Sequence, residues 1–274
     1  FTLSRPGAPS LGLDWFALNV LLLAMLFVPM ERFWPLRPSQ STFRRGWTTD
    51  ALYFLVSHLF VQVTTFLILA PAQAAFAALD GQGWREAIAS PPLVLQFFAV
   101  LLCADLAEYF IHRAFHSVPV LWRFHAIHHS SLDMDWLAGS RLHIVDVIVT
   151  RAVVVLPLFA LGFDQRAVVA YLVFVSFPAV FIHANVRFDL RRLERWIVTP
   201  RFHHWHHAKA RAALDKNFAV HLPWIDRVFG TAYEPAGRWP EAYGIEGDPV
   251  PADLVPQTLW PLRRSRRGAP TARS

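Results

Sequence analysis

Three histidine clusters dominate the chemistry that this sequence could perform. Eleven of its thirteen histidines lie between His112 and His207. The clusters read H-x-x-x-H, H-x-x-H-H and H-x-x-H-H, at His112 and His116; His125, His128 and His129; and His203, His206 and His207. Residues three or four apart share one face of a helix, so each cluster would point its imidazoles in one direction. Three such clusters on three segments could surround one point.

The number of imidazoles indicates more than one metal ion. A structural zinc site takes about four ligands, and eight clustered histidines with the separate His183 exceed that number. Two metals with four or five nitrogens each fit the count. Imidazole suits iron, copper, zinc and nickel, so the ligand type does not choose among them. The sequence has no H-E-x-x-H motif, which argues against a zinc protease.

Further residues near the clusters are candidates for supporting roles. Asp105 and Glu108 precede the first cluster at helical spacing and could be ligands or could hold an imidazole by its second nitrogen. His204 and His143 are less certain metal or supporting residues. Asp133 and Asp135 are more typical of solvent-facing loop acids. Four aromatic residues could line a substrate channel or anchor the protein at a membrane surface, namely Trp136, Phe181, Phe202 and Trp205.

The elements that must position these clusters are apolar. Hydrophobic residues make up 54% of the chain, and they come in blocks. The five apolar runs are Leu13 to Met30, Ala51 to Ala70, Leu93 to Ile111, Ile144 to Leu161, and Ala167 to Ile182. A spanning helix needs about 17–25 apolar residues. The pattern therefore predicts an all-α integral membrane protein with four to five membrane helices, the last two possibly a hairpin kinked by Pro157 and Pro178.

Arginine is unevenly distributed among the loops. Arginine-rich segments at 32–45, 113–141 and 187–201 alternate with loops that contain a single arginine, Arg85 or Arg166. By the positive-inside rule the rich loops face the cytoplasm. All three clusters would then lie in a cytoplasmic helical cap, whether the chain crosses five times or four times with a hairpin. The scarcity of lysine relative to arginine is typical of a GC-rich bacterial genome, so we expect the membrane to be a bacterial inner membrane.

Composition also disfavours other classes. The net charge of +6 could suggest nucleic acid, but the arginines flank apolar runs, so we expect no nucleic-acid partner. A single cysteine, Cys103, cannot hold an iron–sulfur cluster. We expect three parts: N-terminal membrane helices over 1–92, a histidine-cluster domain over 93–233 and a weakly ordered tail over 234–274.

The clusters and the segments around them resemble the fatty acid hydroxylase/sterol desaturase superfamily, the membrane histidine-box di-iron oxygenases. The resemblance covers about residues 93 to 233. Beyond the three boxes it rests on Phe181-Ile-His-Ala-Asn185, Thr199-Pro-Arg-Phe-His203, Asp215-Lys-Asn-Phe218 and Trp224-Ile-Asp-Arg-Val-Phe-Gly-Thr231. The second box, H-x-x-H-H, differs from the H-x-x-x-H-H of alkane hydroxylases and acyl-CoA desaturases.

The resemblance implies an O2-dependent enzyme that hydroxylates or desaturates a sterol, a fatty acyl chain or a related lipid. It implies two iron ions, Fe2+ or Fe3+, bound by nine histidines, namely His112, His116, His125, His128, His129, His183, His203, His206 and His207. Some members carry a fused cytochrome b5 domain. No such segment stands out here, so we expect a separate electron donor, either cytochrome b5-like or a ferredoxin with its reductase. The segment Arg187 to Arg195 could dock such a donor, although topology alone explains its charge.

Three alternatives stay open at this point. A pterin-dependent ether-lipid monooxygenase belongs to a related family with the same boxes. A histidine-rich metal transporter is disfavoured, because transporters bind near mid-span and these clusters lie at span ends and in loops. A scaffold with one structural zinc would leave several imidazoles unused.

Overall fold

The computed structural model describes residues 13–57, 60, 76, 83–246 and 250–263. Within these residues the regular elements are all helical, and the only β pairings are two isolated bridges, Pro35 with Val186 and Ala208 with Tyr243. The prediction of an all-α chain is therefore confirmed for the described part. The second apolar run, Ala51 to Ala70, lies mostly outside it; residues 47–57 are helical.

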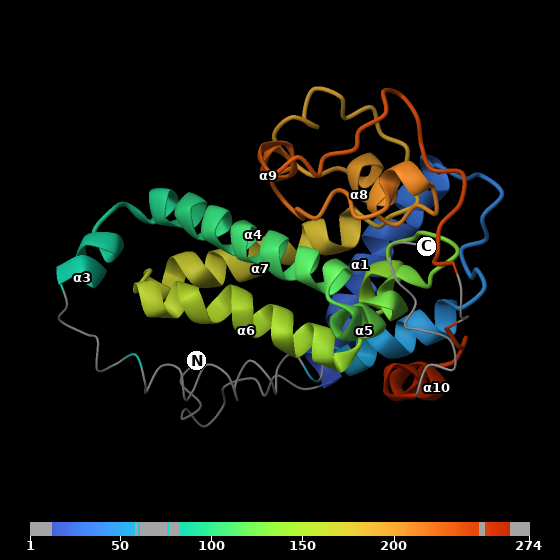
Figure 1. The fold of residues 1–274 in the computed structure, drawn as a ribbon, viewed down its shortest axis with the longest axis horizontal. Helices are drawn as coiled ribbons and strands as arrows, with labels where there is room; N and C mark the ends of the chain where they lie inside the picture. The colour runs from blue at the N-terminus through green and yellow to red at the C-terminus, as the bar shows by residue number, and fades with distance from the viewer. Residues whose placement is uncertain (1–12, 58–59, 61–75, 77–82, 247–249, 264–274) are drawn as a thin grey trace.

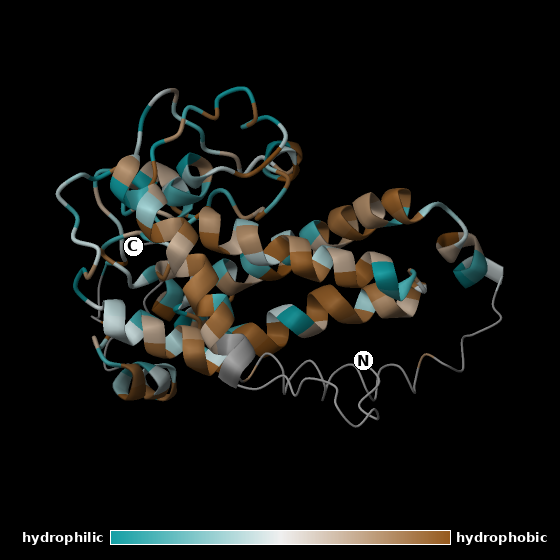
Figure 2. Cartoon of the chain, turned by 180° about the vertical axis from the view of Figure 1, so that it is seen from behind, coloured by the Kyte–Doolittle hydropathy of each residue, from teal (hydrophilic) through white to brown (hydrophobic). Residues whose placement is uncertain are grey.

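Three long helices form the body of the molecule. α4 (Leu93–Ser117), α6 (Ile144–Leu161) and α7 (Gln165–Phe181) lie side by side, and α4 packs against both of the others (Figure 1). Most of the residues in these helices are hydrophobic (Figure 2). α4 and α6 are long and apolar enough to cross a membrane by length and composition, and α7 is one residue shorter than α6. The number of spans, four to five, stays a prediction.

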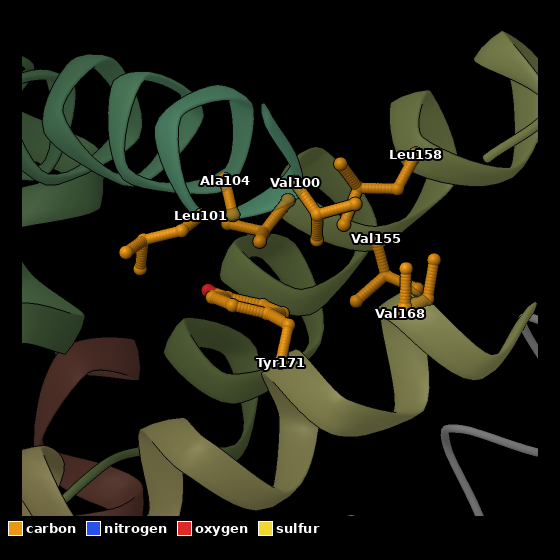
Figure 3. Packing of buried hydrophobic residues seen from close by; sticks show 9 residues of the cluster. Val100, Leu101, Ala104, Val155, Leu158, Val168 and Tyr171 are labelled. Atoms are coloured by element: carbon orange, nitrogen blue, oxygen red, sulfur yellow. The ribbon is translucent and has the colours of Figure 1, made fainter. Parts of the chain in front are cut away.

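The contact between these helices uses small and β-branched side chains. Val100 and Ala104 of α4 meet Val155 of α6 and Val168 and Tyr171 of α7 in one buried cluster (Figure 3). Small residues such as Ala104 let helix backbones approach closely, which is how membrane helices associate. The cluster fixes the three helices relative to one another. It thereby also fixes the position of the histidine-bearing elements at the end that the helices share.

α6 and α7 run in opposite directions, and each packs against α4. A tight turn joins them, in which Gly162 adopts a left-handed φ of 85° after α6 and the Asp164 side chain caps α7 by accepting from Arg166 N. Pro157 and Pro178 lie inside helices that continue past them. Whether the pair spans or dips into the bilayer stays a prediction.

Most of the remaining elements gather at one end of these three helices (Figure 1). α5 (Pro119–His129) follows α4 directly, and α8 (Pro200–His206), α9 (Trp224–Val228) and their loops lie beside it. Three 3-10 turns, η1 (Ala138–Ser140), η2 (Arg211–Ala213) and η3 (Trp260–Leu262), complete this cap together with α10 (Leu254–Leu259). α3 (Gly83–Ala89) lies at the opposite end.

The N-terminal helix α1 (Leu13–Phe33) and the segment after it are bonded to the cap. Arg44 forms buried ion pairs with Asp50 and Asp135, and Arg141 pairs with Asp50. Asp135 is therefore a buried ion-pair partner, so its interpretation as a solvent-facing loop acid was wrong. A buried charge is stable only when paired, so this network ties residues 44–50 firmly to the loop that follows α5.

Part of the segment after residue 233 is also packed in the cap. Tyr243 is buried against Met134 and Ala138, and Trp260 is buried against Trp122. The described residues 234–246 and 250–263 thus include buried aromatic anchors. The three-part division of the chain stays a prediction.

Candidate metal centre

The nine predicted ligands gather in two groups of buried imidazoles. Each group offers one nitrogen per residue, and within each group these nitrogens all lie within 4.8 Å of one another. The first group, here called the five-histidine group, consists of His112, His116, His125, His129 and His206. The second, the four-histidine group, consists of His128, His183, His203 and His207. That these residues bind metal stays a prediction, but the structure brings all nine together as that prediction requires.

Local sequence explains how each helix presents its histidines. α4 continues as helix past its apolar part to Ser117, so that His112 and His116 share one face. Pro119 starts α5 at its first turn, where a missing amide proton costs nothing. α8 begins in the same way, with Thr199 accepting from Phe202 N and with Pro200 next. α5 and α8 each contribute histidines to both groups.

In the five-histidine group four of the five outward nitrogens have fixed partners. His112 Nδ1 donates to Phe218 O at 2.8 Å, and His206 Nδ1 donates to Lys216 O at 2.8 Å. His125 Nδ1 lies 2.6 Å from Asp146 Oδ2, and His116 Nδ1 lies 3.3 Å from Asp215 Oδ1. Because each Nδ1 holds the proton, each Nε2 presents a lone pair to the centre of the group.

The loop behind this group is shaped to supply two carbonyls. Asp215 and Asn217 adopt left-handed φ angles of 55° and 60°, which aspartate and asparagine tolerate better than most residues. The Asn217 amide donates to Phe202 O and Tyr233 O, and the Asp226 carboxylate accepts from Phe218 N and Ala219 N. The carbonyls of residues 216 and 218 are thereby held against the histidines.

The inward nitrogens are spaced as ligands of a shared ion. Nε2–Nε2 distances are 3.1 Å for His112–His125, 3.2 Å for His116–His129 and 2.9 Å for His183–His203. Two nitrogens bound to one metal at about 2.1 Å lie about 3.0 Å apart in octahedral and about 3.4 Å apart in tetrahedral coordination. His206 Nε2 is buried and has no hydrogen-bond partner among the described residues. Neighbouring lone pairs at this spacing repel each other. A cation between them would attract both lone pairs and so remove this repulsion.

Burial keeps these imidazoles in the form that binds metal. Burial and then neighbouring imidazoles lower the pKa of His128, His129, His203 and His207 well below the usual value for histidine. Burial lowers the pKa of His206 to about 3 and that of His183 to about 4. Only a neutral imidazole has the free lone pair that a metal needs, so the site is prepared for a cation at neutral pH.

The less certain candidates lie outside both groups. His204 is buried between Tyr243 OH and His183 O, at 2.8 and 3.3 Å. His143 caps α6 by accepting from Val145 N, and its Nε2 donates to Thr258 O. Asp105 accepts from the backbone amides of Val220, His221 and Leu222, so it fixes the chain next to Phe218 and contacts no ligand. Glu108 interacts electrostatically with Arg151 of α6.

The four candidate channel residues lie in three packing clusters. Trp136 and Phe181 belong to one cluster with Phe27 and Val186. Phe202 packs with Tyr109 and Phe218, whereas Trp205 packs with Ala208 and donates from Nε1 to Arg238 O. Their role along a substrate channel stays a prediction.

Comparison with known proteins shows the family of this site. A family model described as fatty acid hydroxylase matches residues 97–231, which contain both imidazole groups. Residues 97–231 therefore form a fatty acid hydroxylase domain. The resemblance inferred from the histidine boxes is thereby confirmed. No solved structure matches the chain.

Three relatives illustrate the range of proteins to which this chain is similar. An ornithine lipid hydroxylase from Rhizobium tropici is 28% identical over 265 residues, which cover 92% of this chain and 77% of the relative. Human alkylglycerol monooxygenase is 33% identical over 135 residues, 49% of this chain and 30% of the relative. A very-long-chain aldehyde decarbonylase from Oryza sativa subsp. indica is 25% identical over 46% of this chain and 22% of the relative. The chain thus spans less than a third of the length of the last two.

Proposed function

We propose that this chain is an O2-dependent di-iron oxygenase that hydroxylates or desaturates a membrane lipid. The observation that carries this proposal is the pair of imidazole groups, five and four residues strong, at one end of an apolar three-helix bundle. Nine converging nitrogens suit two metal ions with four or five nitrogen ligands each. The family match and the ornithine lipid hydroxylase among the relatives support a lipid as substrate.

Iron fits the donor set and the chemistry better than zinc. Imidazole ligands suit both metals, but zinc has no redox chemistry and hydroxylation of a C–H bond needs an oxidising centre. Two bound irons would supply the electrons and the Lewis acidity for O2-dependent oxidation. The protein holds nine buried imidazoles and orients several of them through carbonyls and carboxylates.

Ligand position disfavours the transport alternative. His112 and His116 lie in the last two turns of α4, and the other ligands lie in α5, in α8 and just past the end of α7. A transporter would place its ligands near the middle of spanning helices. An oxygenase acting on lipids needs the metals at the edge of the apolar slab, where a lipid can present a carbon next to its polar head.

An aminoacyl lipid such as an ornithine lipid is the first substrate to test. The alignment with the ornithine lipid hydroxylase extends over 92% of this chain, so it includes the N-terminal helices as well as the histidine boxes. The alignment with human alkylglycerol monooxygenase covers 49% and leaves an ether lipid, with a pterin as electron source, as the second candidate. Omission of a pterin from the assay separates the two.

The remaining expectations complete the proposal. Electrons would come from a separate cytochrome b5-like protein or from a ferredoxin with its reductase, and the arginine-rich loops would place the catalytic side in the cytoplasm of a bacterial inner membrane. The exposed Trp196, next to Arg195, would lie at the membrane–water interface.

Oxygen incorporation tests the proposal. Membranes that contain the chain, supplied with ornithine lipids, an electron donor and 18O2, should yield lipid with one added 18O atom if the chain hydroxylates, or lipid that lacks two hydrogens if it desaturates. His128→Ala and His206→Ala membranes should yield neither product. Unchanged lipid from the wild type, or equal conversion by the wild type and both variants, would contradict the proposal.

A further inference from the structure

We propose that Gly139 and Glu31 are positioning residues for His183, so that the four-histidine group depends on the N-terminal helix. The inference rests on the proposed metal site and adds to it two residues that are not ligands. His183 is the only member of the nine that lies outside the three histidine boxes, and it follows α7, a helix that contributes no other member.

Gly139 provides the space that the His183 ring occupies. A Cβ atom at residue 139 would lie 2.7 Å from His183 Nδ1, 3.1 Å from His183 Cε1 and 3.1 Å from Ala179 O. The His183 Nδ1–H donates to that same carbonyl at 2.9 Å. Any larger residue would therefore displace the ring and disturb the hydrogen bond that turns Nε2 toward His128 and His203, 3.3 and 2.9 Å away. Glycine is needed here for close approach.

Hydrogen bonds to Asp135 hold the η1 turn that contains Gly139 in place. The Asp135 carboxylate accepts from Leu137 N and Ala138 N, and Arg44 binds both oxygens of that carboxylate at 2.7 Å. Gly139 thus belongs to a rigid 3-10 turn that cannot retreat from a new side chain. The His183 ring must move instead.

Glu31 joins this turn to the segment that carries His183. One oxygen, Oε1, accepts from Trp136 N at 2.8 Å and from Asn185 N at 2.9 Å. Asn185 lies two residues after His183, and Trp136 lies three residues before Gly139. The residues that follow α1 also bond to the His183 segment, with Leu36 N donating to Asn185 O and Arg187 N donating to Trp34 O. The Glu31 carboxylate of α1 therefore sets the distance between the His183 ring and the turn that contains Gly139.

Four rings of the five-histidine group are held by residues outside the N-terminal helix. Their outward nitrogens bond to Asp146, Asp215 and the carbonyls of 216 and 218, all of which lie between residues 97 and 231. A change at Gly139 or Glu31 should therefore remove the metal of one group and spare the other, and this selectivity is the signature of positioning.

Metal content per chain provides the test. The full chain and its variants would be purified together from iron-supplemented cells, and iron plus zinc would be measured by elemental analysis. We expect about two metals in the wild type and about one in Gly139→Ala. Gly83→Ala is the matched control, because a Cβ at residue 83 meets no atom within 4 Å, and it should keep about two.

Glu31 allows a second test that does not depend on the first. Glu31→Gln retains an oxygen that can accept both amides, whereas Glu31→Ala removes it. We expect about two metals in Glu31→Gln and about one in Glu31→Ala, with both variants eluting as the wild type does on size exclusion. Equal metal content in these two variants would overturn the role of Glu31, and it would do so even if Gly139→Ala failed to fold.

A double variant separates positioning of His183 from general damage. His183→Ala should hold about one metal, and adding Gly139→Ala to it should cause no further loss, because the ring that collides with the new Cβ is gone. A further loss in the double variant, or about two metals in Gly139→Ala alone, would overturn the inference and leave the di-metal proposal intact. Fewer than two metals in the wild type would overturn the proposed function and this inference together.

Discussion

The two imidazole groups differ in how firmly the protein holds them. Four of the five rings in the five-histidine group have a fixed partner on Nδ1, and two of those partners are carboxylates. In the four-histidine group His183 bonds to Ala179 O, but His128 Nδ1 and His203 Nδ1 have no hydrogen-bond partner within the described part of the chain. A carboxylate on the second nitrogen orients an imidazole and makes it a better ligand.

This difference indicates unequal metal affinities. The five-histidine group offers one more ligand and two carboxylate supports, so we expect it to bind its metal more tightly. The four-histidine group would release its metal first and would leave more of the coordination sphere to other ligands. The two metals would then have different roles. The metal of the five-histidine group would stay firmly bound, and the metal of the four-histidine group would have more coordination positions free for other ligands.

Loss of a ligand should have the largest effect. His206→Ala removes a nitrogen of the five-histidine group, and His128→Ala removes one of the four-histidine group. We expect lipid oxidation to fall to background in both, because both metals take part. Metal analysis should show that His128→Ala keeps the tighter metal. Normal turnover in either variant would mean that the di-iron assignment is wrong.

Asp146→Asn should have the next largest effect. The Asp146 carboxylate lies 2.6 Å from His125 Nδ1, and both side chains are almost completely buried. The amide keeps the shape but loses the charge, so the affinity of the five-histidine group should fall by about 10–100-fold. A competition titration with a chelator measures it. Unchanged release of the tighter metal would mean that the Asp146 carboxylate does not account for the difference in affinity between the two groups.

Asp215→Asn should have a smaller effect at the same group. Its distance to His116 Nδ1 is 3.3 Å, and the carboxylate is 33% exposed, so solvent screens its charge. We expect affinity for the tighter metal to fall by no more than about 10-fold. The same chelator titration applies. A loss greater than that of Asp146→Asn would reverse the ranking of the two carboxylates.

His143→Asn should have the smallest effect. His143 belongs to neither group and caps α6, and asparagine is a good capping residue. Metal content and release should match the wild type, with a change in melting temperature of at most a few degrees. A lost metal would show that His143 supports the centre, contrary to its position.

Sequence periodicity predicted the part of the site that depends on local spacing. The i, i+3 and i+4 intervals at His125, His128 and His129 hold because α5 is a helix throughout. The same rule could not divide these residues between the two groups, because neighbours on one helix face different metals. That division depends on how α5 and α8 pack, which is a property of the tertiary fold.

Supporting residues were harder to find because they are distant in sequence. Asp146 is 21 residues from His125 and Asp215 is 99 residues from His116. The carbonyls of 216 and 218 carry no side-chain signal at all. Helical spacing placed Asp105 on the face of His112, but three backbone amides of residues 220–222 bind it instead. The one indication in the sequence was that Asp146 is an acidic residue within the apolar run of α6, where an acid is costly unless it has a function.

Stepwise metal release tests the central claim most directly, namely that each group holds one metal ion. Wild-type protein from iron-supplemented cells would be titrated with a chelator without oxygen, and metal per chain would be followed. The account predicts about two metals that leave in two steps, with only the later step left in His128→Ala. A single metal per chain, or no metal at all, would contradict it.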